Sequence, residues 1–202
     1  MENSGIVPDV SILPAVNKLT GVLPTTEISI FSKYIVSCLL DTTHWVLRDA
    51  ALKKIILNLS LGQYDSSLPV VIRILREYSF VFLNDRNLAL QNCGIRLVLE
   101  ICQTLIRCNN LRENFNIFSG VVPILVDKIS GKFSQTTRSS KECLLLFSNS
   151  DTALCFQVFN FLSRESASPL VCENRLKVCI EILQNLKINP QQVGLFGNLR
   201  SY

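Results

Sequence analysis

The sequence has little of what usually breaks a chain into loops. Its 202 residues include only 8 glycines and 7 prolines, and charged residues make up 18% of the total. Hydrophobic residues make up 48%. This composition excludes an intrinsically disordered chain, and it predicts a folded domain long enough to bury roughly two-thirds of the surface of its unfolded form.

Motifs that carry catalysis are also missing. The chain has no glycine-rich phosphate loop and no GxSxG turn, and its single histidine, His44, has no cysteine or serine nucleophile in a recognisable arrangement. The carboxylates are few and mostly stand near basic residues on expected helix surfaces. We therefore predict no enzymatic activity, no catalytic residues, no cofactor and no small-molecule substrate.

The cysteines lack the spacing of a metal or redox site. Zinc ligands come as close pairs in loops, and the chain has no CxxC pair. We predict no metal site, and we expect most of the cysteines to be small buried residues in a reducing compartment. The eight are Cys38, Cys93, Cys102, Cys108, Cys143, Cys155, Cys172 and Cys179.

No segment indicates a membrane or nucleic-acid partner. The net charge of +4 is mildly basic, and no block rich in lysine and arginine stands out. The first residues lack the basic end and apolar core of a signal peptide, and no uncharged run reaches the length of a membrane span. These features predict a cytoplasmic protein.

What the sequence does contain is helical periodicity. From Thr25 onward, apolar residues recur at three- and four-residue spacing, which predicts an all-α fold, with Thr26 as the expected cap of the first helix. We predict an N-terminal arm or leading helix over residues 1–25, a helical repeat domain over 26–188 and a C-terminal tail over 189–202. Within the domain, helices are expected over about 26–41, 44–60, 67–83, 88–108, 120–130, 136–147, 151–162 and 170–186.

These helices pair into hairpins at a regular interval. Anchors in the four predicted turns, Asp41, Asp85, Gly131 and Ser168, are separated by 44, 46 and 37 residues. This is the period of HEAT and armadillo repeats, whose helix pairs stack because none can bury its apolar face alone. We therefore predict an α-solenoid of HEAT- or armadillo-like hairpins.

An arginine stands seven residues after three of the four anchors. These arginines are Arg48, Arg138 and Arg175, and Asn92 occupies the remaining position. An arginine on the second helix of a hairpin can donate to a turn carbonyl or pair with an aspartate in the neighbouring turn. We expect the three arginines to order the stack rather than to bind a partner.

In such a stack, the turns inside the hairpins emerge along one edge. This edge would present one large aromatic side chain and several cations, a combination that suits an acidic protein surface. The predicted partner-binding residues are His44, Trp45, Arg86, Asn87, Lys132 and Arg164.

Most of these residues also have a simpler structural interpretation. Trp45, at the start of a helix, can cover the core beneath it. His44 has no second ligand at metal-binding spacing, so a capping or exposed role is the alternative. Arg86 and Lys132 can be solvated surface cations.

Two further residues are interpreted structurally. Asp85 can cap the helix that follows it. Gly94 lies inside an expected helix, where glycine costs about 1 kcal/mol relative to alanine, and this predicts close packing against a neighbouring helix.

Three segments resemble one known family. LLDTTHWVLRDAALKKI, residues 39–55, resembles the first-repeat motif of TOG domains, the tubulin-binding HEAT arrays of microtubule polymerases and of CLASP and related ciliary proteins. FLNDRNLALQNCGIRLVLEI is similar to the second repeat, with an asparagine in its turn. VVPILVDKISGKFSQTTRSSKECLLLF is similar to the third, with a lysine-bearing turn. The resemblance covers residues 26–147 and extends loosely to the fourth hairpin.

The resemblance implies that the turn edge binds the αβ-tubulin heterodimer, in a protein of the microtubule, centrosome or cilium. Trp45 matches the first-turn tryptophan of the family, Asn87 and Arg86 match the second turn, and Lys132 matches the basic residue of the third. Arg164 falls in the fourth turn without a close motif around it.

The chain departs from the family in two ways. It offers four hairpins where TOG domains usually have six, and the missing pairs would shorten the binding edge. In addition, Asn92 replaces the expected arginine and Gly131 the expected aspartate. The alternative function is an armadillo or HEAT adaptor whose concave helical surface holds a peptide or helix of another protein. A third is a regulatory domain that has kept the fold and lost the partner.

Overall fold

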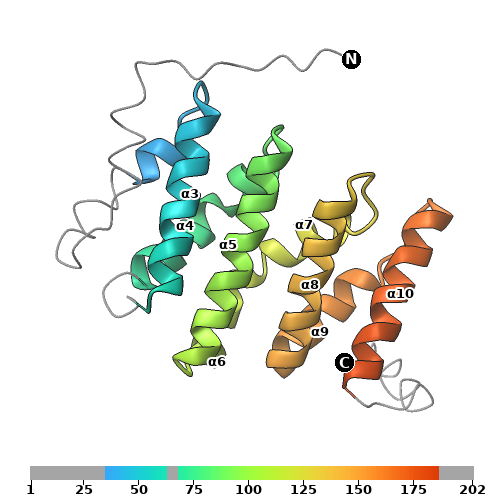
Figure 1. Ribbon diagram of the computed structural model, residues 1–202. Helices are drawn as coiled ribbons and strands as arrows, with labels where there is room; N and C mark the ends of the chain where they lie inside the picture. The colour runs from blue at the N-terminus through green and yellow to red at the C-terminus, as the bar shows by residue number, and fades with distance from the viewer. Residues whose placement is uncertain (1–34, 63–67, 187–202) are drawn as a thin grey trace, which may run out of the picture. The chain divides into compact units, whose positions relative to one another are not determined.

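The structure is a computed structural model, and it describes residues 35–62 and 68–186 (Figure 1). Within these ranges every regular element is a helix, which confirms the predicted all-α class. The chain divides into two compact units, Met1–Thr104 and Leu105–Tyr202, and each is described by itself. The predicted arm over residues 1–25 and the tail over 189–202 lie outside the described residues.

The first unit holds helices at the positions that the periodicity predicts. Residues 35–39 are helical, while the expected start of this helix at Thr26 lies outside the described residues. α3 packs on α4, and the apolar stripes of both helices are buried. The helices are α3 (Trp45–Ser60), α4 (Leu68–Leu83) and α5 (Leu88–Arg107), of which residues 105–107 belong to the second unit.

Gly94 of α5 packs closely against Phe82 of α4. A Cβ atom at Gly94 would lie 2.7 Å from Cδ2 of Phe82 and 3.3 Å from the carbonyl oxygen of Phe82. Phe82 is only 2% exposed, so its ring is held within a packed interior. This confirms the close packing predicted from the glycine in a helical pattern.

The second unit begins with short elements that the periodicity did not predict. A single α-turn and a 3-10 turn fill the interval between the expected helices. They were not predicted because a four-residue element is too short to show a helical period. The ring of Phe118 packs at a centroid distance of 4.6 Å from that of Phe147, so the 3-10 turn contributes to the core. The elements are α6 (Leu111–Asn114), η3 (Phe115–Phe118), α7 (Val121–Lys128), α8 (Ser134–Ser150), α9 (Thr152–Leu162) and α10 (Pro169–Asn185).

The helices of the second unit form two layers. α7 pairs with α8, and α9 pairs with α10, in the hairpins that the sequence predicts. α7 also packs on α9, and α8 packs on α10 (Figure 1). The first helices of the two hairpins are therefore neighbours, and so are the second helices. Asp151 fixes the start of α9, because its Oδ1 accepts hydrogen bonds from the backbone N–H groups of Ala153 and Leu154 at 2.8 and 3.1 Å.

The cysteines, which all lie in the described residues, form no disulfide, and fewer of them are buried than the sequence predicts. Cys38, Cys102 and Cys143 are buried and Cys172 is exposed. The other four are half-buried, namely Cys93, Cys108, Cys155 and Cys179. No helix within residues 35–62 and 68–186 combines the length and apolar character that crossing a bilayer requires. Over the same residues, no three potential metal ligands form a cluster.

Candidate functional site

Asp41 organises the first turn, residues 40–44. Its Oδ1 accepts hydrogen bonds from the backbone N–H groups of Thr43 and His44 at 2.8 and 2.7 Å, and its Oδ2 lies 3.2 Å from Nδ1 of His44. Burial acts to raise the pKa of Asp41, but the hydrogen bonds from His44 and Thr43 outweigh it, and the pKa is lowered from its ordinary value. His44 therefore helps to hold the turn through Asp41.

Trp45 begins α3 directly after this turn. It is half-buried, neither sealed in the core nor fully exposed. The structure therefore leaves part of Trp45 available for a contact.

Arg48 joins the first turn to the second. Its Nη1 donates to the carbonyl oxygen of Asp41, and its Nη2 lies 3.0 Å from Oδ2 of Asp85. The two side chains of this ion pair are only 12% and 10% exposed. The first two turns therefore lie at the same edge of their unit, and the structural role predicted for Arg48 is confirmed.

Asn87 caps α5 at the end of the second turn, residues 84–87. Its Oδ1 accepts the backbone N–H of Ala89 at 2.9 Å, while Oδ1 of Asp85 accepts the N–H of Asn87 itself at 2.8 Å. The cap predicted at Asp85 thus belongs to Asn87, because Asp85 stands two residues before the cap position, and its Oδ1 accepts from Asn87 instead of from the first N–H groups of α5. Arg86, between them in the sequence, is exposed and pairs with no carboxylate of the described residues.

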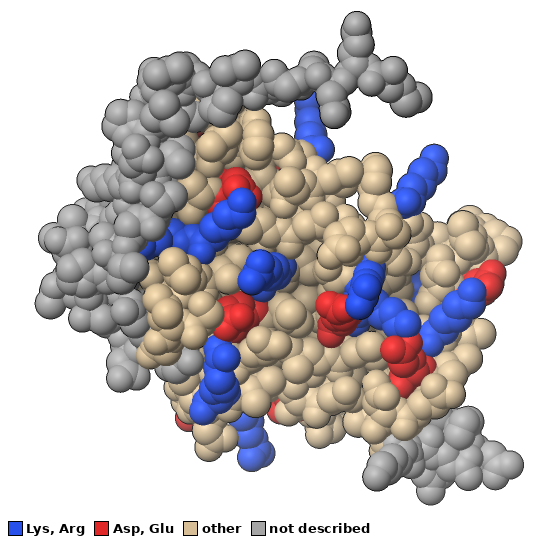
Figure 2. Space-filling model, viewed as in Figure 1, with Lys and Arg blue, Asp and Glu red and all other residues tan. Residues whose placement is uncertain are grey.

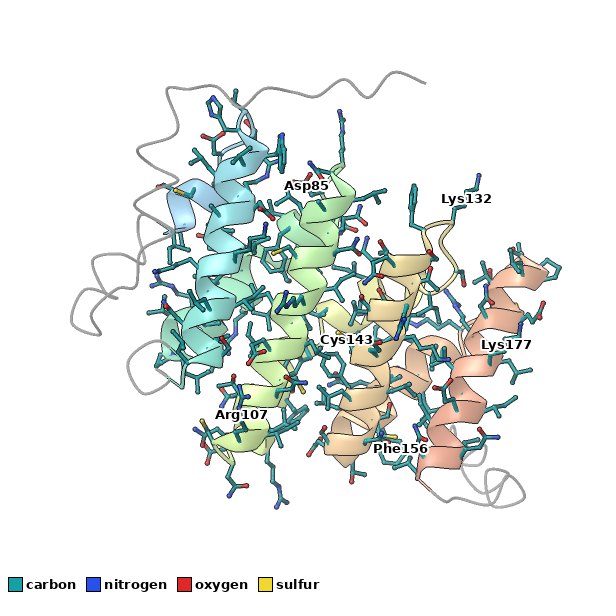
Figure 3. The ribbon with its side chains drawn as sticks, viewed as in Figure 1. Asp85, Arg107, Lys132, Cys143, Phe156 and Lys177 are labelled. Atoms are coloured by element: carbon teal, nitrogen blue, oxygen red, sulfur yellow. The ribbon has the colours of Figure 1, made fainter. Side chains whose placement is uncertain are left out.

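The third turn, residues 129–133, presents Lys132 and Phe133. Thr137 holds the turn, since its Oγ1 donates to the carbonyl oxygens of Lys128 and Gly131 at 3.2 and 3.3 Å. Lys132 is exposed and points away from the helices (Figure 3), and Phe133 is 54% exposed at the N-cap position of α8. Phe133 was not predicted as a site residue, although it is, like Trp45, an aromatic residue between a turn and the second helix of a hairpin.

Arg138 does not take the role that the arginine spacing predicted. It is 76% exposed and pairs with Glu142 one helical turn further along α8, with Nε 3.2 Å from Oε1. One residue corresponds to about 100° around a helix, so the side chain that faces the turn is Thr137 rather than Arg138.

Arg175 closes the fourth turn, residues 163–168. Its Nη1 donates to the carbonyl oxygen of Arg164 at 2.9 Å, and its Nη2 lies 3.5 Å from Oδ1 of Asp127, near the end of α7. This contact brings the fourth turn to the edge where α7 ends, so the third and fourth turns share one edge of their unit. The guanidinium of Arg164 lies 3.8 Å from the centroid of the Phe161 ring, which gives this side chain a packing role as well.

The same kind of side-chain hydrogen bond closes all four turns. In each, a side chain near the start of the second helix donates to a carbonyl oxygen of the turn, and in the second turn Nε2 of Gln91 reaches the carbonyl oxygen of Asp85 at 2.5 Å. The predicted binding residues therefore fall on two edges, one in each unit. The four donors are Arg48, Gln91, Thr137 and Arg175.

Within the described part of the chain, the charged side chains of α8 and α10 are paired, whereas two cations in the turns of the second unit are not. Every charged side chain of α8 and α10 forms an ion pair, and the visible face of the molecule shows cations interspersed with carboxylates (Figure 2). Lys132 and Arg164, in the turns, pair with no carboxylate within residues 35–62 and 68–186. The helix pairs are Arg138 with Glu142, Lys141 with Glu181, Lys177 with Glu173, and Arg175 with Asp127.

No known protein family matches the sequence, and no curated protein matches it.

Proposed function

We propose that the chain is a TOG-like, HEAT-type helical repeat module that binds an acidic protein surface through the edges formed by its turns. The observation that carries the proposal is the charge pattern of the second unit. The cations of α8 and α10 are neutralised by carboxylates, whereas Lys132 and Arg164 are left for a partner that supplies the negative charge.

An aromatic side chain accompanies the cations at both edges, exposed in the second unit and half-buried in the first. Phe133 stands beside Lys132 in the second unit, and Trp45 stands at the edge that carries Arg86 in the first. Aromatic side chains with few rotatable bonds lose little entropy when they are covered, and such residues dominate binding energies at protein interfaces. The cations would steer and orient the partner, and the aromatic residues would supply the buried area.

The packing of the second unit supports a repeat architecture. The first helix of one hairpin packs on the first helix of the next, and the second helix packs on the second. This is the packing expected when each helix pair completes its core by stacking on its neighbour. We extend the same stacking, as a proposal, to a HEAT-type solenoid.

The αβ-tubulin heterodimer is the partner that we propose. The TOG-like motifs around Trp45, Asn87 and Lys132 support this choice, and its place would then be the cytoplasm, at microtubules, the centrosome or the cilium. Because each unit carries its own edge, each should contribute separately to the affinity.

Titration of the fluorescently labelled chain with purified αβ-tubulin, followed by anisotropy, tests the proposal. One double variant, Lys132→Glu with Phe133→Ser, alters the edge of the second unit, and another, Trp45→Ala with Arg86→Glu, alters that of the first. We expect each to weaken binding at least about 10-fold.

The matched control is Arg112→Glu on α6, at the opposite end of the second unit from the Lys132 turn (Figure 1). It reverses one exposed charge and should bind as the parent does. If this control lost as much affinity as the edge variants, the effect would come from net charge and not from the turn edges. Absence of tubulin binding by the folded parent would reject tubulin as the partner, and full binding by both edge variants would favour the adaptor with a concave binding surface.

A further inference from the structure

The outer face of α10 carries apolar side chains that nothing in the described structure covers. Leu170 and Leu176 are 61% and 60% exposed, and Ile180 is 46% exposed. Val178 and Ile182, on the opposite side of the same helix, are buried against the rest of the second unit. Apolar side chains gathered on one exposed face of a helix mark an interaction surface.

Two opposite charges lie on the same face. Glu173 and Lys177 form an ion pair at 2.6 Å, and their side chains are 58% and 63% exposed. At 3.6 residues per turn, these two residues and the three apolar ones fall within an arc of about 120°. The outer face is therefore one stripe, defined here by Leu170, Glu173, Leu176, Lys177 and Ile180.

We propose that this stripe binds the same stripe of a second copy of the chain, with the two α10 helices antiparallel. The order of the residues makes the stripe complementary to itself. Positions 170 and 180 are centred on residue 175, and so are positions 173 and 177. In an antiparallel pair with its two-fold axis at this point, Leu170 faces Ile180 of the second copy, and Glu173 faces Lys177 of the second copy.

Leu176 completes the contact at the axis. It stands one residue from the centre, so the two copies of Leu176 meet each other across the two-fold axis. A parallel arrangement would instead place Glu173 against Glu173 and Lys177 against Lys177, which is repulsive. The charge pattern therefore selects one partner and one orientation.

The interface is small, so the dimer is weak. Three apolar side chains from each copy bury less than the roughly 800 Å² per partner of a standard stable interface. We expect a dissociation constant on the order of 100 µM. The stripe excludes the turn residues Lys132 and Arg164, so this inference does not depend on the proposed tubulin binding.

Sedimentation equilibrium of the full chain between about 10 µM and about 1 mM tests the inference. The weight-average mass of the parent should rise toward that of two chains. Leu176→Asp with Ile180→Asp should remain monomeric at every concentration, while Phe80→Ser, which alters a 70% exposed apolar residue of α4, should dimerise like the parent. A monomeric parent, or a dimer that survives the double variant, would overturn the proposal.

A charge exchange tests the antiparallel arrangement. Glu173→Lys alone puts lysine opposite Lys177 of the second copy, and Lys177→Glu alone puts glutamate opposite Glu173, so each variant should dimerise at least about 10-fold more weakly. An equimolar mixture restores both pairs between unlike chains and should recover the parental affinity. If the ion pair acts only within one helix, mixing recovers nothing, and the proposed orientation is wrong. Far-ultraviolet circular dichroism establishes that each variant remains folded.

Discussion

Nη2 of Arg48, near the start of α3, lies 3.0 Å from Oδ2 of Asp85, in the turn between α4 and α5. The same guanidinium also donates to the carbonyl oxygen of Asp41 in its own turn. One side chain thus satisfies polar groups from two successive turns, and it holds them at one edge of the first unit. Any partner contact that uses this edge depends on the position that Arg48 imposes.

Replacement of Arg48 by alanine should therefore destabilise the protein far more than replacement of Arg138. Arg48→Ala leaves the nearly buried carboxylate of Asp85 without its counter-ion, and breaking such a pair costs about 3 kcal/mol of unfolding free energy. Arg138→Ala removes an exposed pair with Glu142 and should cost less than about 0.5 kcal/mol. Urea denaturation followed by circular dichroism gives both values. Equal losses at the two arginines would contradict the structural role assigned to Arg48.

Gly94→Ala should be destabilising although alanine is the better helix former. The new methyl group would stand 2.7 Å from a ring carbon of Phe82, and the repacking costs about 1–3 kcal/mol, more than the gain of about 1 kcal/mol from helix propensity. Gly120→Ala is the matched control, because nothing lies within 4 Å of its added Cβ, and its unfolding free energy should change by less than about 0.5 kcal/mol. Thermal unfolding of the two variants checks this, and a stabilised Gly94→Ala protein would show that α4 and α5 can separate.

Lys54→Met should stabilise the protein at neutral pH. Lys54 is 2% exposed, and its Nζ finds no hydrogen-bond partner among the described residues, so the ammonium is held out of water without compensation. Methionine has a similar length without the charge, and we expect a gain of about 1–3 kcal/mol in unfolding free energy. Urea denaturation at pH 7 measures the gain, and a loss of stability would show that Lys54 has a counter-ion.

The advantage of Lys54→Met should shrink as the pH rises. Burial lowers the pKa of Lys54 from its ordinary 10.5, so between the two values the unfolded chain binds more protons than the folded one. The stability contributed at this site therefore increases with pH toward 10.5 in the parent, and the variant lacks this increase. The difference in unfolding free energy between parent and variant at pH 7 and at about pH 9.5 checks the sign, because other titrating groups cancel in the difference.

The thiols should differ sharply in their reactivity with iodoacetamide. Burial raises the pKa of Cys102 to about 12 and those of Cys93 and Cys179 to about 11, so these thiols stay protonated and unreactive at about pH 8. Cys172 is exposed and should be alkylated first. Peptide mass spectrometry after short labelling, with and without urea, measures the order. Fast labelling of Cys102 in the native protein would contradict its burial.

Periodicity and turn chemistry were sufficient to predict the helices themselves. The expected helix over residues 44–60 is α3 (Trp45–Ser60), and the one over 67–83 is α4 (Leu68–Leu83). These features depend on residues that are neighbours in the chain, so the sequence displays them directly. α6 and η3 escaped prediction because each is only about one turn long.

The candidate site was predicted less completely. The sequence indicated the turns and the cations Arg86 and Lys132, but it overlooked Phe133 and assigned to Arg138 a role that Thr137 fills. A shift of one residue around a helix changes which element a side chain meets. Spacing along the chain cannot resolve a rotation of this size.

By itself, the sequence determined that the chain is helical and where most of its helices begin and end, because local backbone preferences and apolar spacing act within each segment. Only the tertiary structure decided which side chains close the turns, that the ammonium of Lys54 is buried, and that the outer face of α10 is left apolar and uncovered. Each of these depends on groups from elements far apart in the chain, and their distances are set by packing rather than by sequence separation.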